Sequence, residues 1–185
     1  MLKIVVPKAE LNDPETADFY YTKETVLTLE HSLVSLSKWE SKWKVPFLNN
    51  NHITEAQLRD YIECMTITQN VDPMVYYALT QENLTAVLKY IEDPMTATTI
   101  TEKNTSRFGP AARGAKIITN ELIYYWMTAL NIPFECQKWH LNRLMTLIRV
   151  ASIEQQPPKK MNPRSIMAQN KSLNAARRAR LGSKG

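Results

Sequence analysis

The chain has 185 residues, of which 44% are hydrophobic and 22% charged, as expected for one globular domain of ordinary size with an appendage. It contains only four glycines, and they do not form the closely spaced cluster that a phosphate-binding or dinucleotide-binding loop requires. The net charge of +5 is uneven: residues 157–185 carry eight Lys and Arg and no acid, whereas residues 1–156 have a net charge of −3. These features exclude nucleotide-binding fingerprints and predict a mildly acidic body with a basic tail.

Two cysteines, Cys64 and Cys136, lie far apart in apolar patterns and lack the paired spacing of a zinc site. We therefore expect two reduced, buried thiols. The first residues lack the apolar core of a signal peptide, and no apolar run approaches the roughly 18 residues that a membrane span needs. We expect a cytoplasmic protein that does not bind membranes.

The N-terminal region alternates in the manner of short strands. Residues 3–7 are rich in β-formers, residues 11–18 contain Asn, Asp and Pro, and residues 19–21 and 25–30 resume an extended pattern. We predict a small antiparallel β-ribbon.

Helical periodicity begins after this ribbon. Residues 32–44 place Trp39 and Trp43 one turn apart on one side, and Thr54 starts a capping box before residues 55–65. Asp72 and Pro73 open a short helix to residue 79, and Thr80 caps the next one, residues 81–92.

Residues 93–116 interrupt the pattern and predict a mobile basic loop, with a possible strand at 95–101. Two strong apolar patterns follow, at 119–131 with Trp126 and at 134–152 with Trp139. The short turn between them predicts an antiparallel helical hairpin that forms the core. The fold class is therefore mainly α (α+β), with a body of residues 1–156.

The tail, residues 157–185, begins with two prolines and is expected to form one further helix. Asn162 is an N-cap candidate, Pro163 suits the first helical position, and Gly182 suits the residue after the helix. Its apolar positions form a thin stripe, and a lone helix of this length is only marginally stable in water. We expect this basic helical arm to bind a partner surface.

The sequence offers little that is typical of catalysis. The histidines (His31, His52 and His140) lack metal-ligand spacing, so we predict no metal, no cofactor and no catalytic residues. Cys136 and His140 stand four residues apart in one predicted helix, but nothing there would activate a thiolate. The acids Glu30, Glu40, Asp60 and Glu63 are interpreted as solvated. We predict that the chain is not an enzyme.

Protein contact is the preferred interpretation of the tail, ahead of a solvated helix and of a nucleic-acid arm. The tail would attract phosphate, but it has no aromatic residue on which bases could stack. The predicted protein-binding residues are large aromatic side chains of the body and cations of the tail: Trp39, Trp43, Trp126, Trp139, Lys159, Lys160, Arg164, Lys171, Arg177, Arg178 and Arg180.

Several runs together resemble a group of proteins from long-tailed phages and prophages that are classed with the tail assembly chaperones. They are residues 29–33 (LEHSL), 35–43 (SLSKWESKW), 60–66 (DYIECMT), 94–98 (PMTAT), 121–127 (ELIYYWM), 132–144 (IPFECQKWHLNRL), 157–161 (PPKKM) and 173–178 (LNAARR).

The resemblance implies a protein of the host cytoplasm that coats the tape-measure protein, a long helical polypeptide, until the tube subunit polymerises around it. Expected partners are the tape-measure protein and the tube subunit, with a second copy of the chain as a further candidate. The alternatives are a permanent component of the tail, baseplate or connector, which would remain in the virion, and a nucleic-acid-binding protein that acts through the basic arm.

Overall fold

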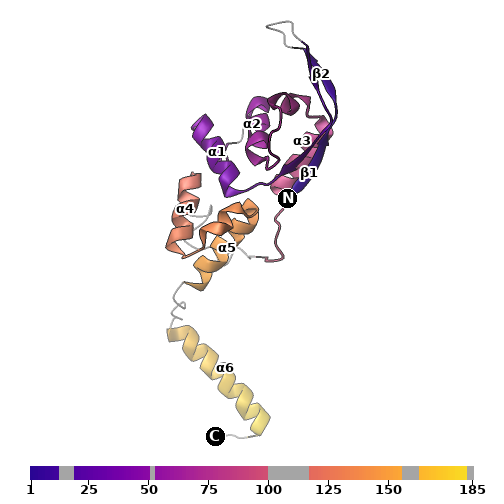
Figure 1. Cartoon of the computed structure of the whole chain (residues 1–185). Coiled ribbons are helices and arrows are strands. Elements are labelled where there is room, and N and C mark those ends of the chain that lie inside the picture. The colour runs from indigo at the N-terminus through magenta and orange to yellow at the C-terminus, as the bar shows by residue number, and fades with distance from the viewer. Residues whose placement is uncertain (13–18, 51–52, 100–116, 156–162, 183–185) are drawn as a thin grey trace. The chain divides into compact units, whose positions relative to one another are not determined.

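A computed structural model describes residues 1–12, 19–50, 53–99, 117–155 and 163–182 (Figure 1). Its contacts divide the chain into two units, Met1–Glu154 and Gln155–Gly185. The fold is mainly α-helical with an N-terminal antiparallel ribbon, so the predicted fold class is confirmed. Most of the predicted loop at 93–116 lies outside the described residues.

The ribbon is longer than predicted and consists of two pairs of strands. Strand β1 (Leu2–Val6) pairs with β4 (Thr25–Leu29), and β2 (Ala9–Asn12) pairs with β3 (Phe19–Thr22). The residue numbers of every pair add up to 31, so both pairs belong to one hairpin in a single register. Pro7 lies in the gap between β1 and β2, where its missing N–H cannot contribute to the ladder.

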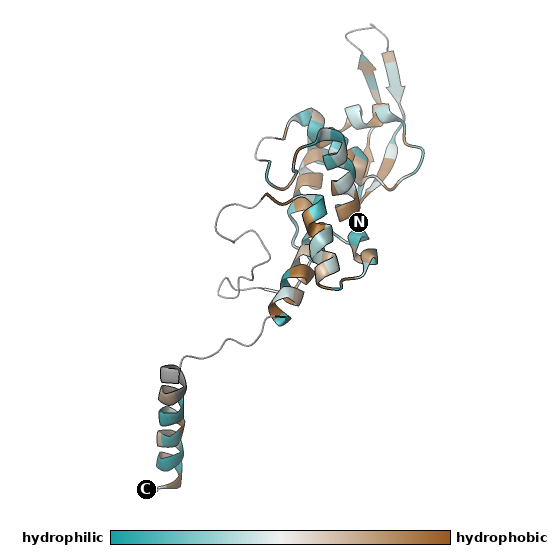
Figure 2. Ribbon diagram, turned by 90° about the vertical axis from the view of Figure 1, so that its left-hand side faces the viewer, coloured by the Kyte–Doolittle hydropathy of each residue, from teal (hydrophilic) through white to brown (hydrophobic). Residues whose placement is uncertain are grey.

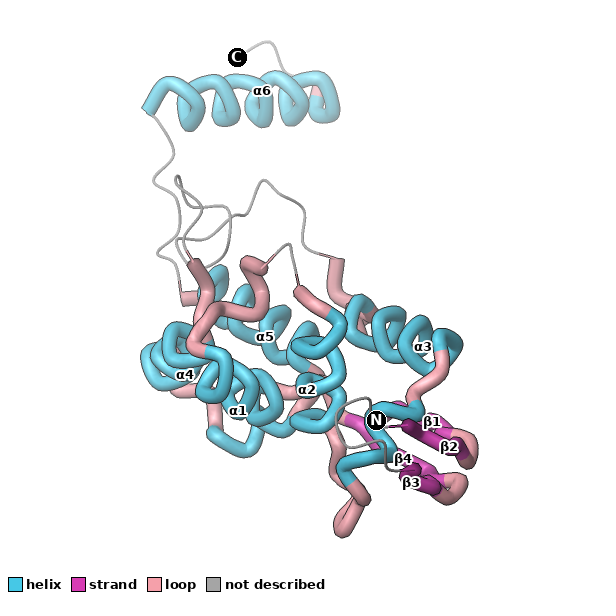
Figure 3. Tube along the Cα trace, turned by 90° about the horizontal axis from the view of Figure 1, so that it is seen from above, coloured by secondary structure: helices cyan, strands magenta, loops and turns pink. Residues whose placement is uncertain are grey.

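The base of the ribbon is covered by the body. Side chains of β1 and β4 alternate, and one set is buried: Ile4, Val6, Leu27 and Leu29. Helices α1 (Leu33–Trp43) and α2 (Glu55–Met65) follow and pack against each other (Figure 3). Both begin with a capping box, Ser32 with Ser35 and Thr54 with Gln57. The second of these was predicted.

The next two elements also begin where the sequence indicates. Asp72 caps η1 (Pro73–Ala78), a 3₁₀ helix, and Thr80 caps α3 (Gln81–Glu92). The strand suggested at 95–101 is wrong for its described residues, because Met95 has a positive φ of 49°. The Met95 N–H donates to the Asp93 carboxylate at 2.8 Å, and this hydrogen bond makes a turn.

The predicted helical hairpin is only partly right. Helix α4 (Asn120–Ala129) agrees with its pattern, but residues 134–152 form two elements, the 3₁₀ helix η3 (Phe134–Lys138) and helix α5 (Leu141–Glu154). The break falls at Trp139, whose backbone is extended, and at His140. The His140 Nδ1 atom accepts a hydrogen bond from the N–H of Asn142 at 3.3 Å, so its side chain caps α5.

Helix α1 is the centre of the helical part, in place of the predicted hairpin. It contacts α2, α4 and η3, and Leu33, Leu36 and Trp39 on it are fully buried. The buried core extends from Ile4 to Ile148 and therefore belongs to the unit Met1–Glu154.

The second unit contains helix α6 (Pro163–Leu181). Pro163 is its first residue, and Gly182 follows it with a φ of +62°, as the sequence predicts. Asn162, the expected N-cap, lies outside the described residues. Hydrophilic colours dominate α6 in Figure 2.

Candidate functional site

The four tryptophans predicted to bind protein fall into two groups. Trp39 and Trp126 are 0% and 4% exposed, so they are core residues. In this structure a partner protein could not contact either indole ring. Trp39 donates its Nε1–H to the Gln57 carbonyl at 2.9 Å, and Phe47 packs edge-on against its ring. The sequence pattern identified the apolar face correctly, but it cannot distinguish a buried indole from an exposed one.

Trp43 and Trp139 keep part of their surface in solvent. Trp43 donates its Nε1–H to the Asp60 carboxylate at 2.9 Å, and Lys42 lies 2.8 Å from the same oxygen. The guanidinium of Arg143 lies 4.4 Å from the centre of the Trp139 ring. Only these two tryptophans can meet a partner without rearrangement of the core.

Further aromatic side chains, which the sequence analysis did not single out, are exposed on α4 and η3. Tyr125 on α4 and Phe134 on η3 are both more than half exposed, and the Phe134 ring lies 6.4 Å from that of Tyr124. We call Tyr125, Phe134 and Trp139 the α4–η3 aromatic surface. Exposed aromatic side chains are a common component of protein-binding surfaces.

The basic residues of the arm are only partly described. Lys171, Arg177, Arg178 and Arg180 lie on α6 and are exposed, as is every side chain from Met167 to Gly182. Arg164 lies on α6 as well, but its side chain is outside the described set, as are Lys159 and Lys160 entirely. Lys171 and Arg178 stand seven residues apart and therefore lie on one side of the helix.

The large apolar side chains that the structure describes on α6 are exposed. Met167, Leu173 and Leu181 are between 49% and 77% exposed, and the helix has no acidic residue. Such a helix gains stability when a partner covers its apolar side chains and neutralises its charge.

A buried polar cluster lies where α1 and α5 begin. The rings of His31 and His140 meet edge-on at 5.1 Å, and the His31 Nδ1 atom is 2.6 Å from the Tyr61 hydroxyl. His140 Nε2 lies 3.0 Å from the carbonyl oxygen of Tyr90 and donates a hydrogen bond to it. The other ring nitrogen, Nδ1, accepts a hydrogen bond from the N–H of Asn142. The neutral tautomer of His140 follows from these partners.

Burial keeps both imidazoles uncharged. It lowers the pKa of His31 to about 3, and the nearby His140 adds to the effect. Burial also lowers the pKa of His140, against an opposing contribution from its hydrogen bond to Tyr90. The hydroxyl of Tyr90 donates to the Glu30 carboxylate at 2.7 Å. These hydrogen bonds join distant segments and leave both imidazoles closed to solvent.

Cys136 and His140 do not share a helix, contrary to expectation, because Cys136 belongs to η3 and His140 precedes α5. The Cys136 side chain is buried, and burial raises the pKa of the half-buried Cys64 thiol. Within the described residues, no group of three or more His, Cys, Asp and Glu side chains is arranged to hold a metal ion. The described helices also include none with the length and apolar character of a membrane span.

Glu40 has a structural role that the sequence analysis missed, since it was interpreted as a solvated acid. Its side chain is buried, and Oε1 accepts from the N–H of Phe47 at 2.9 Å. Oε2 accepts from the backbone and side-chain N–H groups of Asn120 at 2.8 and 2.7 Å. Because Thr119 makes no side-chain cap, Glu40 caps α4 from α1.

Comparison with known proteins gives no relative: no family model, no curated protein and no solved structure matches this chain at a significant level.

Proposed function

We propose that this chain is a non-enzymatic tail assembly protein of a long-tailed phage, and that it acts as a chaperone for the tape-measure protein. The class comes from the sequence resemblance, which extends from residue 29 to residue 178. The observation that carries a binding role is α6, a basic helix whose described side chains are all exposed and which has no acid to balance its cations.

The physical problem that such a chaperone solves is exposure of apolar surface. A tape-measure protein is a very long helical polypeptide, and apolar stripes on it would aggregate before the tube encloses them. The uncompensated positive charge of the arm attracts acidic stretches over a distance comparable to the Debye length. Met167, Leu173 and Leu181 then supply apolar contacts at close range.

The body offers a second contact region in the α4–η3 aromatic surface. Tyr125 and Phe134 present large apolar area at a low cost in side-chain entropy, and Arg143 extends the charge beside Trp139. The interior does not resemble a catalytic site, because His31 and His140 are neutral and enclosed and the Cys136 thiol is buried. These features favour binding over chemistry.

The test is co-expression with the tape-measure protein of the same phage. We expect the tape-measure protein to become soluble and to co-purify with this chain. A variant with Lys171, Arg177, Arg178 and Arg180 all changed to Gln should bind at least about tenfold more weakly. A matched control, with exposed Asn170 and Asn174 on the same helix changed to Gln, should bind normally.

Three results would contradict the proposal. If the tape-measure protein stays insoluble and unbound, the chaperone role is wrong. If the chain is retained in purified virions, a permanent component of the tail, baseplate or connector is the better assignment. A gel shift with double-stranded DNA that the quadruple variant abolishes, together with unchanged tape-measure binding, would assign the arm to nucleic acid.

A further inference from the structure

The two edges at the base of the ribbon are covered by other parts of the body. Along β4, the N–H of Glu30 donates to the Met65 carbonyl at 2.9 Å, and the N–H of Ile67 donates to the Thr28 carbonyl at 2.8 Å. Along β1, the side-chain amide of Asn83 donates to the Val5 carbonyl at 3.1 Å. Covering an edge in this way prevents it from pairing with another chain.

The outer part of the ribbon, β2 and β3, lacks this protection. It extends beyond the helices in Figure 1, and η1 lies against it near Thr22, which is buried. In the described part of the chain, no hydrogen bond reaches β2 or β3 from outside the ribbon. Phe19, Tyr20 and Tyr21 are 59%, 39% and 73% exposed.

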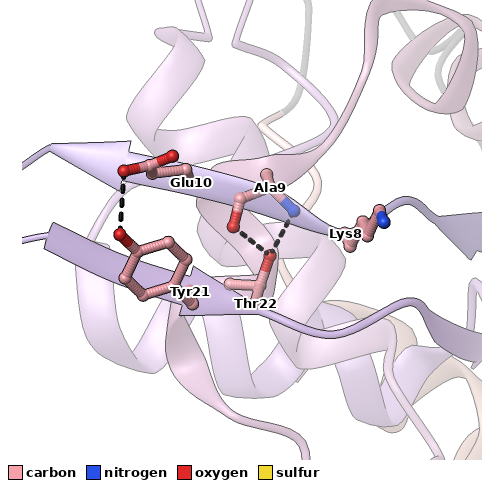
Figure 4. Close-up of a pocket in the computed structure, with 5 residues that line it drawn as sticks. All are labelled: Lys8, Ala9, Glu10, Tyr21 and Thr22. Atoms are coloured by element: carbon pink, nitrogen blue, oxygen red, sulfur yellow. Dashed lines mark hydrogen bonds between the residues drawn. The ribbon is translucent and has the colours of Figure 1, made fainter.

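The geometry of the Ala9–Thr22 pair shows which backbone groups of β3 point outward. The Thr22 hydroxyl accepts from the Ala9 N–H at 3.1 Å and donates to the Ala9 carbonyl at 3.3 Å (Figure 4), so the Ala9 backbone faces β3. Facing direction alternates along an antiparallel pair. The N–H and C=O groups of Phe19 and Tyr21 therefore point away from β2.

Strands β2 and β3 differ in charge, and the difference favours β3 as the edge that pairs with a second copy. About a two-fold axis the residue on the axis lies opposite its own copy and its neighbours lie diagonally near theirs, so a charge on the paired strand is brought close to the same charge of the other copy. Strand β3 has the sequence FYYT and carries no charge, lysine or proline that would block pairing. Strand β2 carries Glu10, whose carboxylate accepts from the Tyr21 hydroxyl at 3.0 Å (Figure 4).

We propose that β3 is a self-association edge, on which β3 of a second copy of this chain pairs antiparallel about a two-fold axis at Tyr20. Phe19 of each copy then lies opposite Tyr21 of the other, and the outward N–H and C=O groups of both residues are satisfied. The four strands form one sheet, whereas an isolated pair of strands is only marginally stable. The inference does not depend on the proposed chaperone role.

The test uses the full-length chain and sedimentation equilibrium over a range of concentrations. We expect a monomer–dimer equilibrium in the wild type. Tyr20→Lys and Tyr20→Glu, each alone, should weaken the dimer about tenfold or more, because each places its charge opposite itself and removes an aromatic pair. Mixing the two variants should restore dimers of one copy of each. Leu88→Lys, at an apolar side chain of α3 that is 44% exposed against 39% for Tyr20, should leave the dimer intact.

A second variant, Tyr21→Pro, removes an outward N–H and the exposed side-chain hydrogen bond to Glu10, and leaves the inward backbone hydrogen bonds of β3 in place. It should also prevent the dimer while far-ultraviolet circular dichroism and the melting temperature remain those of the wild type. A wild-type chain that stays monomeric at every concentration would overturn the proposal. So would a dimer that tolerates both Tyr20 variants, which would place the interface elsewhere.

Discussion

At the scale of single residues, the two buried histidines make stability depend on pH. His31 and His140 are neutral in the folded protein, and burial lowers the pKa of each below the value of about 6.5 in an unfolded chain. Below that pH the unfolded state binds more protons than the folded state. Stability is therefore fully present above pH 6.5 and is lost as the pH falls toward the folded pKa, about 3 for His31.

We expect the free energy of unfolding to fall between pH 6.5 and 4 by up to about 1.4 kcal/mol per pH unit because of His31, and His140 contributes in the same direction. Glu30, Asp93 and the amino group of Met1 also act on His140. Urea titrations at several pH values would measure the slope. His140→Asn, which keeps a good helix cap, should make the slope shallower. An unchanged slope would show that His140 does not contribute to the acid sensitivity.

Glu40 is the second residue whose role depends on distant partners. Its carboxylate accepts three hydrogen bonds and links α1 to Phe47 and to the start of α4. We expect Glu40→Ala to lower the free energy of unfolding by about 3 kcal/mol, because three buried N–H groups lose a charged acceptor. Chemical denaturation measures this loss.

Glu63 provides the matched control, since it is exposed on neighbouring α2. Glu63→Ala should change the free energy of unfolding by no more than about 0.5 kcal/mol. Equal losses in the two variants would contradict the capping role of Glu40.

At the scale of elements, the signals that the sequence predicts well are local. The caps at Thr54, Asp72 and Thr80, the Pro163 start and the Gly182 end all depend on residues within one turn. The base of the ribbon is predictable because one face of β4 is apolar. These elements form as expected since nothing in the tertiary structure opposes their local preference.

What the sequence does not reveal are contacts between distant segments. The helix expected at 134–152 breaks because His140 caps α5 and faces His31, more than a hundred residues earlier. Glu40 is missed for the same reason, since Asn120 is 80 residues away. The burial of Trp39 and Trp126 likewise depends on which helices meet, which periodicity within one helix cannot indicate.

The end of α6 gives a prediction at this scale. Gly182 has a φ of +62°, and a Cβ there would meet nothing within 4 Å, so a substitution acts through the backbone alone. We expect Gly182→Ala to destabilise the last turn by about 1 kcal/mol, and Gly182→Asn by less, because Asn tolerates this conformation better. Hydrogen exchange at residues 178–181 would detect faster opening. Equal protection in all three chains would mean that this cap does not stabilise α6.

At the scale of the whole molecule, core and charge are separated along the chain. The buried core lies between Ile4 and Ile148, whereas the described side chains from Met167 onward are exposed. Residues 157–185 carry eight of the 23 basic residues and none of the 18 acids. Stability and long-range attraction for a partner therefore reside in different parts of the protein.

This separation predicts the behaviour of a chain that ends at Glu154. Because none of the described residues beyond Glu154 belongs to the core, we expect its free energy of unfolding to stay within about 0.5 kcal/mol of the full chain. Its net charge becomes negative, so its association with an acidic partner should be slower and less sensitive to salt. Chemical denaturation and binding kinetics at two salt concentrations measure the two effects separately. A large loss of stability would show that the arm is packed on the body, which would contradict its role as an independent binding element.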